Sequence, residues 1–276
     1  MKLQLANLRQ NDIYYRINAK GVEMVIQDIE DTPREIIALA TDYEDGTFLP
    51  MHQHQRAQFL YSIRGMMEVS TDHDRWLVFP DSGVWIPPQK QHSVRMLNAS
   101  TRSLYIAPEL SLRGEQCEVV KVSKLMHTLL IEATEIPRLY ESHGRNATLL
   151  QLLMYEIQNA DILPFHIPLP QDSTLLALCQ SFIQSPNIHE PLEKWANLTH
   201  KSTRTFSRFF QKETGMTFSQ WRQQICLLYA LTELTKKQPV TNIALSLGYE
   251  SISAFSAMFK KALSYSPSEF SQFPTL

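Results

Sequence analysis

The sequence predicts an α+β protein of two domains, in which a β-barrel with following helices precedes an all-α domain built from two helix-turn-helix units. Three observations predict it: short β-rich runs up to residue 110, helical periodicity after Cys117, and one helical pattern that occurs twice in the last third. We expect these domain boundaries: 1–118 for the barrel, 119–161 for a helical connector, 162–173 for a linker and 174–276 for the second domain.

The barrel is predicted from short runs rich in Val, Ile, Tyr, Phe and Trp. Gly, Pro, Asp and Asn separate these runs at the spacing of an all-β sandwich or barrel. The runs read REIIALAT, QFLYSIRG, MMEVST, RWLVFP, GVWIPP and SLYIAP. The composition, 43% hydrophobic and 20% charged, is that of an ordinary globular chain with enough apolar residues for two cores.

Two helices are expected after the barrel, at about Ser123 to Ile136 and Pro137 to Asn159. Their apolar residues recur with the 3.6-residue helical period and include Leu125, Leu129, Leu149, Leu150 and Leu153. Three prolines then fall within residues 162–173, and because proline favours extended backbone this segment is the best candidate for an interdomain linker.

Composition also bears on location. No apolar stretch approaches the roughly 20 residues that span a bilayer, and the first residues, MKLQLANLRQND, lack the hydrophobic centre of a signal peptide. We therefore expect a cytoplasmic protein without membrane contact. Its three cysteines, Cys117, Cys179 and Cys226, form no CxxC pair, so we interpret them as buried structural thiols rather than disulfide partners or zinc ligands.

The last third contains an internal repeat. In each copy a serine that can cap a helix is followed by apolar or small residues at offsets of 4, 7, 8 and 13. The first copy has Ser202, Phe206, Phe209, Phe210 and Gly215, and the second has Ser251, Phe255, Met258, Phe259 and Ser264. Each copy predicts a short helix, a tight turn and a longer helix fixed to a core by its aromatic face.

The opposite face of the first longer helix carries basic, hydroxyl and amide side chains. They are Lys201, Ser202, Thr203, Arg204, Ser207, Arg208, Gln211 and Lys212, and no acidic residue occurs from 194 until Glu213. Such side chains can contact base edges and neutralise phosphates in a major groove; the alternative is a solvated basic face on a helical bundle. Residues 172–276 have ten Lys or Arg against seven Asp or Glu, a net charge of +3 within a chain of −2.

Residues 172 to 271 resemble the DNA-binding domain of the AraC family of transcription regulators. The matching segments are LEKWANL, STRTFSRFFQKETGMTFSQWRQ, VTNIALSLGYESISAFSAMFKKA and SPSEF, with His200 and Ser264 where glycine is usual. The resemblance implies reading helices at about Ser202 to Thr214 and Ser251 to Leu263. In the second of these, Ser251, Ser253, Ser256 and Lys260 are expected to position the protein on DNA more than to select bases.

The segment MHQHQRAQ belongs to a second resemblance. From Gly46 to Gly65 the spacing resembles the first motif of cupin barrels, with Gln58 at the usual glutamate position, and GVWIPPQKQHSV resembles the second. His52 and His54 share one strand face, so they can converge with Gln58 and His92 inside the barrel. These residues could bind Zn²⁺, Ni²⁺, Mn²⁺ or Fe²⁺, contact an effector directly, or form hydrogen bonds in a polar interior. We leave these alternatives open.

Together the two resemblances imply a transcription factor whose cupin-like domain senses a small molecule or a metal. They also imply promoter DNA, a small-molecule effector, RNA polymerase and a second copy of the chain as partners, with the connector helices as the dimer contacts. We assign no catalytic residue and expect no enzyme, because no further acid or base accompanies the histidines. The alternatives are a cupin-type metal enzyme with a DNA-binding tether and a nonspecific nucleoid protein.

Overall fold

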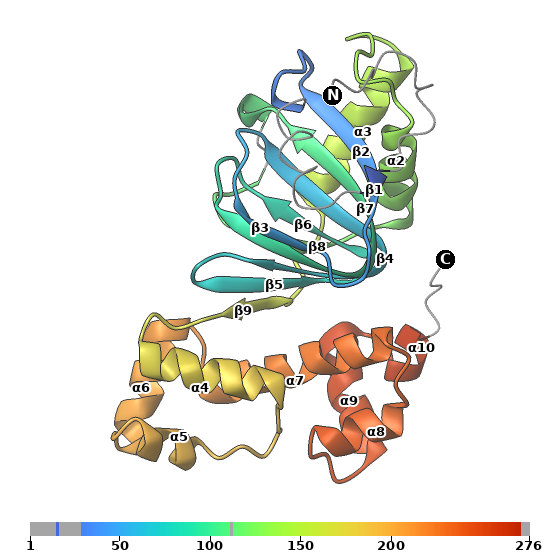
Figure 1. Ribbon diagram of the computed structural model, residues 1–276. Coiled ribbons are helices and arrows are strands. Elements are labelled where there is room, and N and C mark those ends of the chain that lie inside the picture. The colour runs from blue at the N-terminus through green and yellow to red at the C-terminus, as the bar shows by residue number, and fades with distance from the viewer. Residues whose placement is uncertain (1–14, 17–28, 111–112, 272–276) are drawn as a thin grey trace. The chain divides into compact units, whose positions relative to one another are not determined.

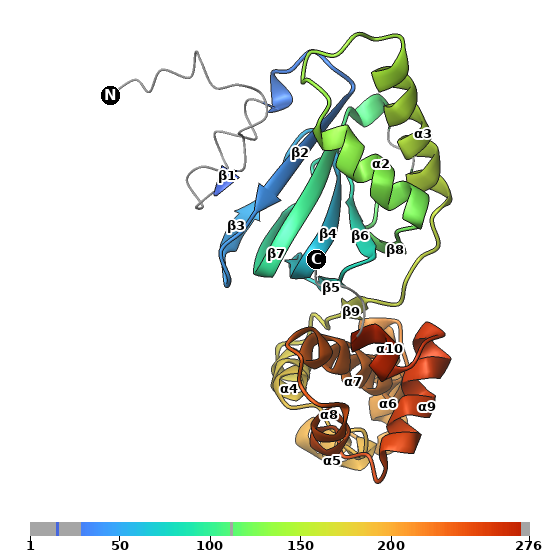
Figure 2. The ribbon, with the colours of Figure 1, turned by 90° about the vertical axis from the view of Figure 1, so that its right-hand side faces the viewer.

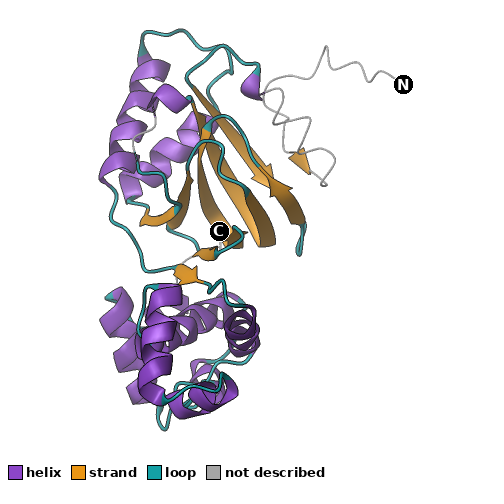
Figure 3. Ribbon diagram, turned by 90° about the vertical axis from the view of Figure 1, so that its left-hand side faces the viewer, coloured by secondary structure: helices purple, strands orange, loops and turns teal. Residues whose placement is uncertain are grey.

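The structure is a computed structural model that describes residues 15–16, 29–110 and 113–271 (Figure 1). The chain divides into two compact units. The first contains the residues up to Thr71 together with Trp76–Pro164, and the second contains Asp72–Arg75 and the residues from Phe165 onward. Strands dominate the first unit and helices dominate the second (Figure 3).

The sheet of the first unit has β7 at its centre. Its strands are β1 (Tyr15–Arg16), β2 (Ile36–Asp42), β3 (Phe48–His52), β4 (Ala57–Ser70), β5 (Asp74–Val78), β6 (Ser82–Ile86), β7 (His92–Ile106) and β8 (Glu118–Lys121). β7 pairs with β2, β3 and β4, β4 also pairs with β6, and β6 pairs with β8. These pairings are antiparallel, whereas β1 and β2 pair in parallel, and the strands confirm the predicted N-terminal β domain.

Strand register brings distant residues of the cupin-like motifs together. His52 on β3 lies opposite His92 on β7, and Gln58 on β4 lies opposite Tyr105 on β7. The pairing of β4 with β7 is irregular between Ser62 and Met66, and such irregularities let long strands bend. The two motifs, far apart in the sequence, therefore meet on one part of the sheet.

Two helices follow the strands, α2 (Lys124–Thr134) and α3 (Arg145–Asn159), and they pack against the sheet (Figure 2). Ser123 caps α2 by accepting a hydrogen bond from the Met126 amide. The prediction that the second helix begins at Pro137 was wrong, because α3 begins at Arg145. Gly144 precedes it with φ +99°, a backbone conformation that ends the preceding loop and cannot continue a helix.

The predicted leucines of these helices divide between the core and the surface. Leu129, Leu150 and Leu153 are buried in the core of the same chain, together with Phe59 and Trp85 of the sheet. Leu149 is partly buried against that core, and Leu125 is 49% exposed. The apolar residues of these helices therefore mainly cover the sheet. Their period is compatible with such packing as well as with the dimer contacts that the resemblance implies.

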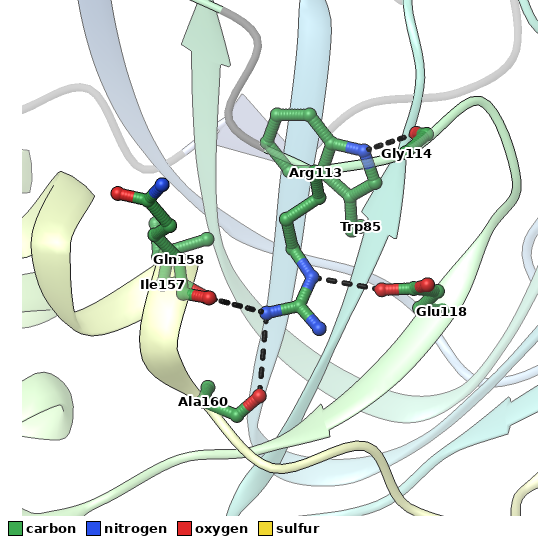
Figure 4. A network of polar contacts seen from close by, with 7 residues as sticks. All are labelled: Trp85, Arg113, Gly114, Glu118, Ile157, Gln158 and Ala160. Carbon is green, nitrogen blue, oxygen red and sulfur yellow. Dashed lines mark hydrogen bonds and ion pairs between the residues drawn. The ribbon is translucent and has the colours of Figure 1, made fainter.

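Arg113 connects the end of α3 to the sheet (Figure 4). Its Nε is 2.8 Å from Glu118 Oε2, while its Nη1 donates to the carbonyl oxygens of Ile157 at 2.7 Å and of Gln158 and Ala160 at 3.3 Å. The last carbonyls of a helix have no partner within the helix, so a buried guanidinium here satisfies several of them at once.

The second unit is helical apart from β9 (His166–Pro168). Its helices are α4 (Ser173–Gln184), α5 (Leu192–Leu198), α6 (Thr203–Thr214), α7 (Phe218–Thr235), α8 (Val240–Ser246), α9 (Ile252–Leu263) and α10 (Pro267–Ser271). Aromatic residues of four helices form its core: Phe182, Trp195, Phe206 and Trp221 have neighbouring ring centroids 5.6 to 6.4 Å apart. Trp221 also donates through Nε1 to the Pro168 carbonyl at 3.1 Å, which fixes β9 on α7.

The three cysteines are buried, and none forms a disulfide within the described residues, in agreement with their interpretation as structural thiols. Burial raises the pKa of both the Cys179 and the Cys226 thiol to about 12. Within the described part of the chain, no helix has the length and apolar character needed to cross a membrane.

Candidate functional site

The first helix-turn-helix unit consists of α5, a turn and α6. Ser202 caps α6 by accepting a hydrogen bond from the Thr205 amide, and Gly215 ends it with φ +72°, a left-handed conformation that suits glycine. Phe206 and Phe210 are fully buried beneath it. The sequence thus determines both ends of α6 and the face that packs on the core.

The outer face of α6 carries the residues expected to contact DNA. Ser202, Thr203, Arg204, Ser207, Arg208, Gln211 and Lys212 are all exposed. The first acidic residue after them, Glu213, accepts hydrogen bonds from the backbone amides of Gln171 and Asp172 at 3.0 and 3.1 Å. Its carboxylate is therefore engaged at the start of α4, and the polar face of α6 keeps its positive charge.

Lys201 differs from these residues because it is half-buried. Its ammonium group lies 4.6 Å from the ring centroid of Phe209, a cation–π distance, and donates to the Thr199 carbonyl at 3.4 Å. Phe209, which the sequence groups with the buried aromatics, is itself only half-buried. The pair closes the turn before α6, where His200 has φ +53°.

The second helix-turn-helix unit consists of α8, a turn and α9, and it is built in the same way as the first. Ser251 caps α9 by accepting from the Ala254 amide, and Ser264 ends it with φ +69° at the position equivalent to Gly215. Ser251, Ser253 and Lys260 are exposed, whereas Ser256 is half-buried. Serine and lysine side chains suit phosphate contacts, and this face has no Arg, Asn or Gln for bidentate base recognition.

A short segment before α5 connects the two helix-turn-helix units, and no signal in the sequence indicates this role. The Ile188 amide donates to the Leu247 carbonyl at 2.9 Å, at the end of α8. The Glu190 carbonyl accepts from Arg222 Nη1 at 2.5 Å, on α7. The spacing of α6 and α9 is thus set by this segment as well as by α7, which lies between them in the chain.

The predicted histidines meet in the first unit. The ring centroid of His52 lies 4.3 Å from that of His92 and 6.2 Å from that of His54, and the His54 and His92 centroids are 5.2 Å apart. Gln58 joins them, with its amide oxygen position 3.1 Å from His54 Nε2. Burial is the main cause that lowers the pKa of all three imidazoles, that of His92 to about 3, so they are neutral near pH 7.

Their hydrogen bonds determine which nitrogen carries the proton. Each Nδ1 faces a backbone carbonyl: that of Pro50 for His52 at 2.7 Å, that of Arg56 for His54 at 2.5 Å, and that of Lys90 for His92 at 2.7 Å. A nitrogen facing a carbonyl oxygen must donate, so each Nε2 carries a lone pair, and the Gln58 amide therefore turns its NH2 group rather than its oxygen toward His54 Nε2. Among the described residues, Nε2 of His92 is buried without a hydrogen-bond partner.

These lone pairs prompt a test of the predicted metal site. Histidine ligands of a metal commonly donate their other ring nitrogen to a carbonyl, as these three do. Nevertheless, no group of three or more His, Cys, Asp or Glu side chains within the described residues is arranged to hold a metal ion. The same lone pairs also suit the N–H or O–H groups of a ligand.

Three further residues lie beside the histidine cluster, which we define as His52, His54, Gln58 and His92. Ser103 and Tyr105 are near the Gln58 amide, at 3.4 and 3.1 Å, and their spacing of two on the predicted strand SLYIAP was the signal that could have found them. Glu30, whose carboxylate weakly opposes the lowering of the His54 pKa by burial, comes from outside any motif. It accepts a hydrogen bond from the Gln55 amide at 2.7 Å.

Two domain families match the chain. Residues 35–157 match the AraC-like ligand binding domain, and residues 195–272 match a helix-turn-helix domain. The HTH-type transcriptional regulator NimR of Escherichia coli is 30% identical over 222 residues, which cover 80% of this chain and 81% of NimR. The chain belongs to the AraC family of helix-turn-helix transcriptional regulators. The histidine cluster of this AraC-family regulator lies within its ligand-binding domain, and α6 and α9 lie within its DNA-binding domain.

Other relatives of this AraC-family regulator are more distant. The uncharacterized HTH-type transcriptional regulator YobQ of Bacillus subtilis is 23% identical, with 78% of this chain and 86% of YobQ covered. A crystal structure of ToxT from Vibrio cholerae is 11% identical, with a TM-score of 0.36 and coverage of 86% of this chain and 97% of that chain.

Proposed function

We propose that this transcriptional regulator selects its promoter sequence with α6 and uses α9 chiefly to fix its position on the DNA backbone. The observation that supports this division is the exposed outer face of α6, where Arg204, Arg208 and Gln211 lie in a stretch of sequence without acidic residues. Arginine and glutamine can form paired hydrogen bonds to guanine and adenine edges, while the serines and lysines of α9 suit phosphate oxygens.

The test compares Arg208→Ala with Lys260→Ala on an operator and its single-base variants. Arg208→Ala should cost about 1–3 kcal/mol on the preferred base and relax the preference there, whereas Lys260→Ala should weaken all sequences alike. Lys236→Ala is a matched control, because this exposed lysine on the far end of α7 pairs with Glu233 at 2.8 Å. Equal and sequence-blind losses in both test variants would contradict the division.

We also propose that the histidine cluster is the place where the ligand-binding domain contacts its signal. Three imidazole acceptors, of which those of His54 and His92 are buried and that of His92 has no partner among the described residues, support direct contact with hydrogen-bond donors of an effector. Effector binding would then shift the population of arrangements in which α6 and α9 engage DNA.

Metal analysis of the purified protein decides between direct contact and a metal. We expect the same metal content in the natural protein and in a His52→Ala/His54→Ala variant, while the variant loses the effector's influence on operator binding. Stoichiometric Zn²⁺, Ni²⁺, Mn²⁺ or Fe²⁺ that disappears with the histidines would refute direct contact and establish a metal site.

Finally, we propose that the regulator acts as a homodimer through the outer faces of α2 and α3. Leu125, Leu152 and Tyr155 are 49%, 42% and 55% exposed on these faces, whereas the inner leucines are occupied by the core. Leu152→Glu should produce a monomer in sedimentation, and Leu198→Glu, with similar exposure but on α5, should not. A concentration-independent monomer of the natural protein on operator DNA would contradict the dimer.

RNA polymerase is the further partner that we propose at the promoter, and transcription in a purified system tests it.

A further inference from the structure

A pocket of about 690 Å³ lies apart from the histidine cluster, in the first unit. It is lined by the start of β2, the loop after α2 and buried and exposed residues of α3, including Tyr155. Its apolar lining includes Ile36, Leu150 and Met154, which are core residues, so the pocket opens onto the core itself. The volume is within the range of roughly 300–1,000 Å³ typical of small-molecule sites, and none of the histidines of the cluster lines it.

The polar lining carries two charges that cancel. Arg34 and Glu35 both line the pocket, and within the described part of the chain neither forms an ion pair. The Arg34 guanidinium donates through Nε to the Tyr140 carbonyl at 2.6 Å and through Nη1 to the Pro33 carbonyl at 2.7 Å. The guanidinium is thus anchored by two backbone carbonyls, and its remaining N–H groups and the exposed Glu35 carboxylate give the lining a donor and an acceptor.

The wall that carries these groups is held rigidly by a neighbouring arginine. Arg56 is 7% exposed, and its Nη1 donates to the carbonyls of Arg34 and Glu35 at 2.8 and 3.2 Å. Its Nη2 donates to the Thr32 carbonyl at 2.9 Å. On the opposite wall, Arg113 holds the α3 carbonyl of Gln158, another residue that lines the pocket. Walls fixed before binding reduce the entropy that a ligand must lose.

We propose that this pocket binds a small, uncharged molecule with an apolar body and a polar edge that both donates and accepts hydrogen bonds, as a primary amide does. The apolar lining matches the body, and the pair Arg34 and Glu35 matches an edge with an acceptor and a donor. A ligand with a full charge of either sign would face one like charge in the lining. This proposal goes beyond the proposed function and does not depend on the histidine cluster.

The test uses three probes of one shape: biphenyl-4-carboxamide, biphenyl-4-carboxylate and 4-phenylbenzylamine. Binding to the full chain is measured by ligand-observed NMR titration. The amide should bind at least about fivefold more tightly than either charged probe, and Ala147→Phe, which fills the pocket from α3, should weaken it by about tenfold or more. Thr148→Phe adds the same bulk at the exposed neighbouring position and should leave binding unchanged. If Ala147→Phe fails to fold, Arg34→Met replaces it and should remove the preference for the amide.

Each other outcome overturns part of the proposal. Tighter binding of the carboxylate or the amine refutes the uncharged ligand class. Binding that is insensitive to both Ala147→Phe and Arg34→Met, or that His52→Ala abolishes, places the probe elsewhere and refutes the site. Because operator binding is measured on the same variants, failure of the pocket is distinguishable from failure of the proposed DNA reading.

Discussion

Arg113→Met should strongly destabilise the ligand-binding domain. The change removes the ion pair with Glu118 and the donor to the carbonyls of Ile157, Gln158 and Ala160 at the end of α3 (Figure 4). The Arg113 side chain is 8% exposed and that of Glu118 is 25% exposed, so water can partly rehydrate the carboxylate but not the inner carbonyls. Hydrogen bonds to charged groups contribute about 1.5–3 kcal/mol each before such rehydration, so we expect a loss of about 2–4 kcal/mol.

The assay is urea unfolding followed by circular dichroism, with amide hydrogen exchange to localise the effect. Exchange should accelerate most at the last turn of α3, because the helix end loses its partner. Arg145→Met is the matched control: Arg145 and Glu132 pair at 3.1 Å with side chains 73% and 48% exposed, so its removal should cost less than about 0.5 kcal/mol. If Arg113→Met costs no more than Arg145→Met, the reasoning about buried helix-end carbonyls is wrong.

Three further predictions concern backbone strain and buried thiols. His200→Gly should stabilise the DNA-binding domain by about 0.5–1 kcal/mol in thermal unfolding, because His200 has φ +53°; a loss of stability would show that the imidazole contributes more than the strain costs. Gly248→Ala should destabilise it by about 1–2 kcal/mol, since φ is +83° and a Cβ there would lie 2.7 Å from Asn187 Oδ1; unchanged urea unfolding would contradict this. Burial raises the pKa of Cys179 and Cys226 from 9.0 to about 12, so the unfolded thiols ionise first and the free energy of unfolding should fall as pH rises from 9 to 12. Alanine at both positions should flatten that pH dependence, and an unchanged slope would exclude these thiols as its cause.

The DNA-binding domain was largely predictable from local patterns. Ser202 and Gly215 cap the two ends of α6, as the sequence indicates. The 3.6-residue period of its apolar residues identified the buried Phe206 and Phe210. Helix caps and the amphipathic period of a helix involve residues only a few positions apart, so both can be recognised in a single sequence. Phe209 is an exception, because it is only partly buried and the Lys201 ammonium group lies 4.6 Å from its ring centroid.

The histidine cluster was predictable in membership but not in arrangement. The prediction that His52 and His54 share one strand was wrong, because β3 ends at His52 and His54 follows it. The register of β3 with β7 nevertheless brings His92 opposite His52. The positions of Tyr105 and Glu30 beside the histidine cluster depend on how strands and loops pack. The same packing decides which ring nitrogen of each histidine faces a backbone carbonyl. Whether imidazoles form a metal site depends on differences of about an ångström that spacing in the sequence does not encode.

The sequence by itself determined the two-domain plan, the paired helix-turn-helix units and the family, because each rests on local periodicity, caps or motif spacing. Only the tertiary structure decided that the leucines of α2 and α3 mainly serve the core, that Arg113 holds the end of α3, and that a pocket opens beside Arg34. The physical reason is range. Helix and strand signals arise between residues a few positions apart, whereas burial, ion pairing and cavities arise between segments such as Arg34 and Tyr140, 106 residues apart, which meet only in the folded chain.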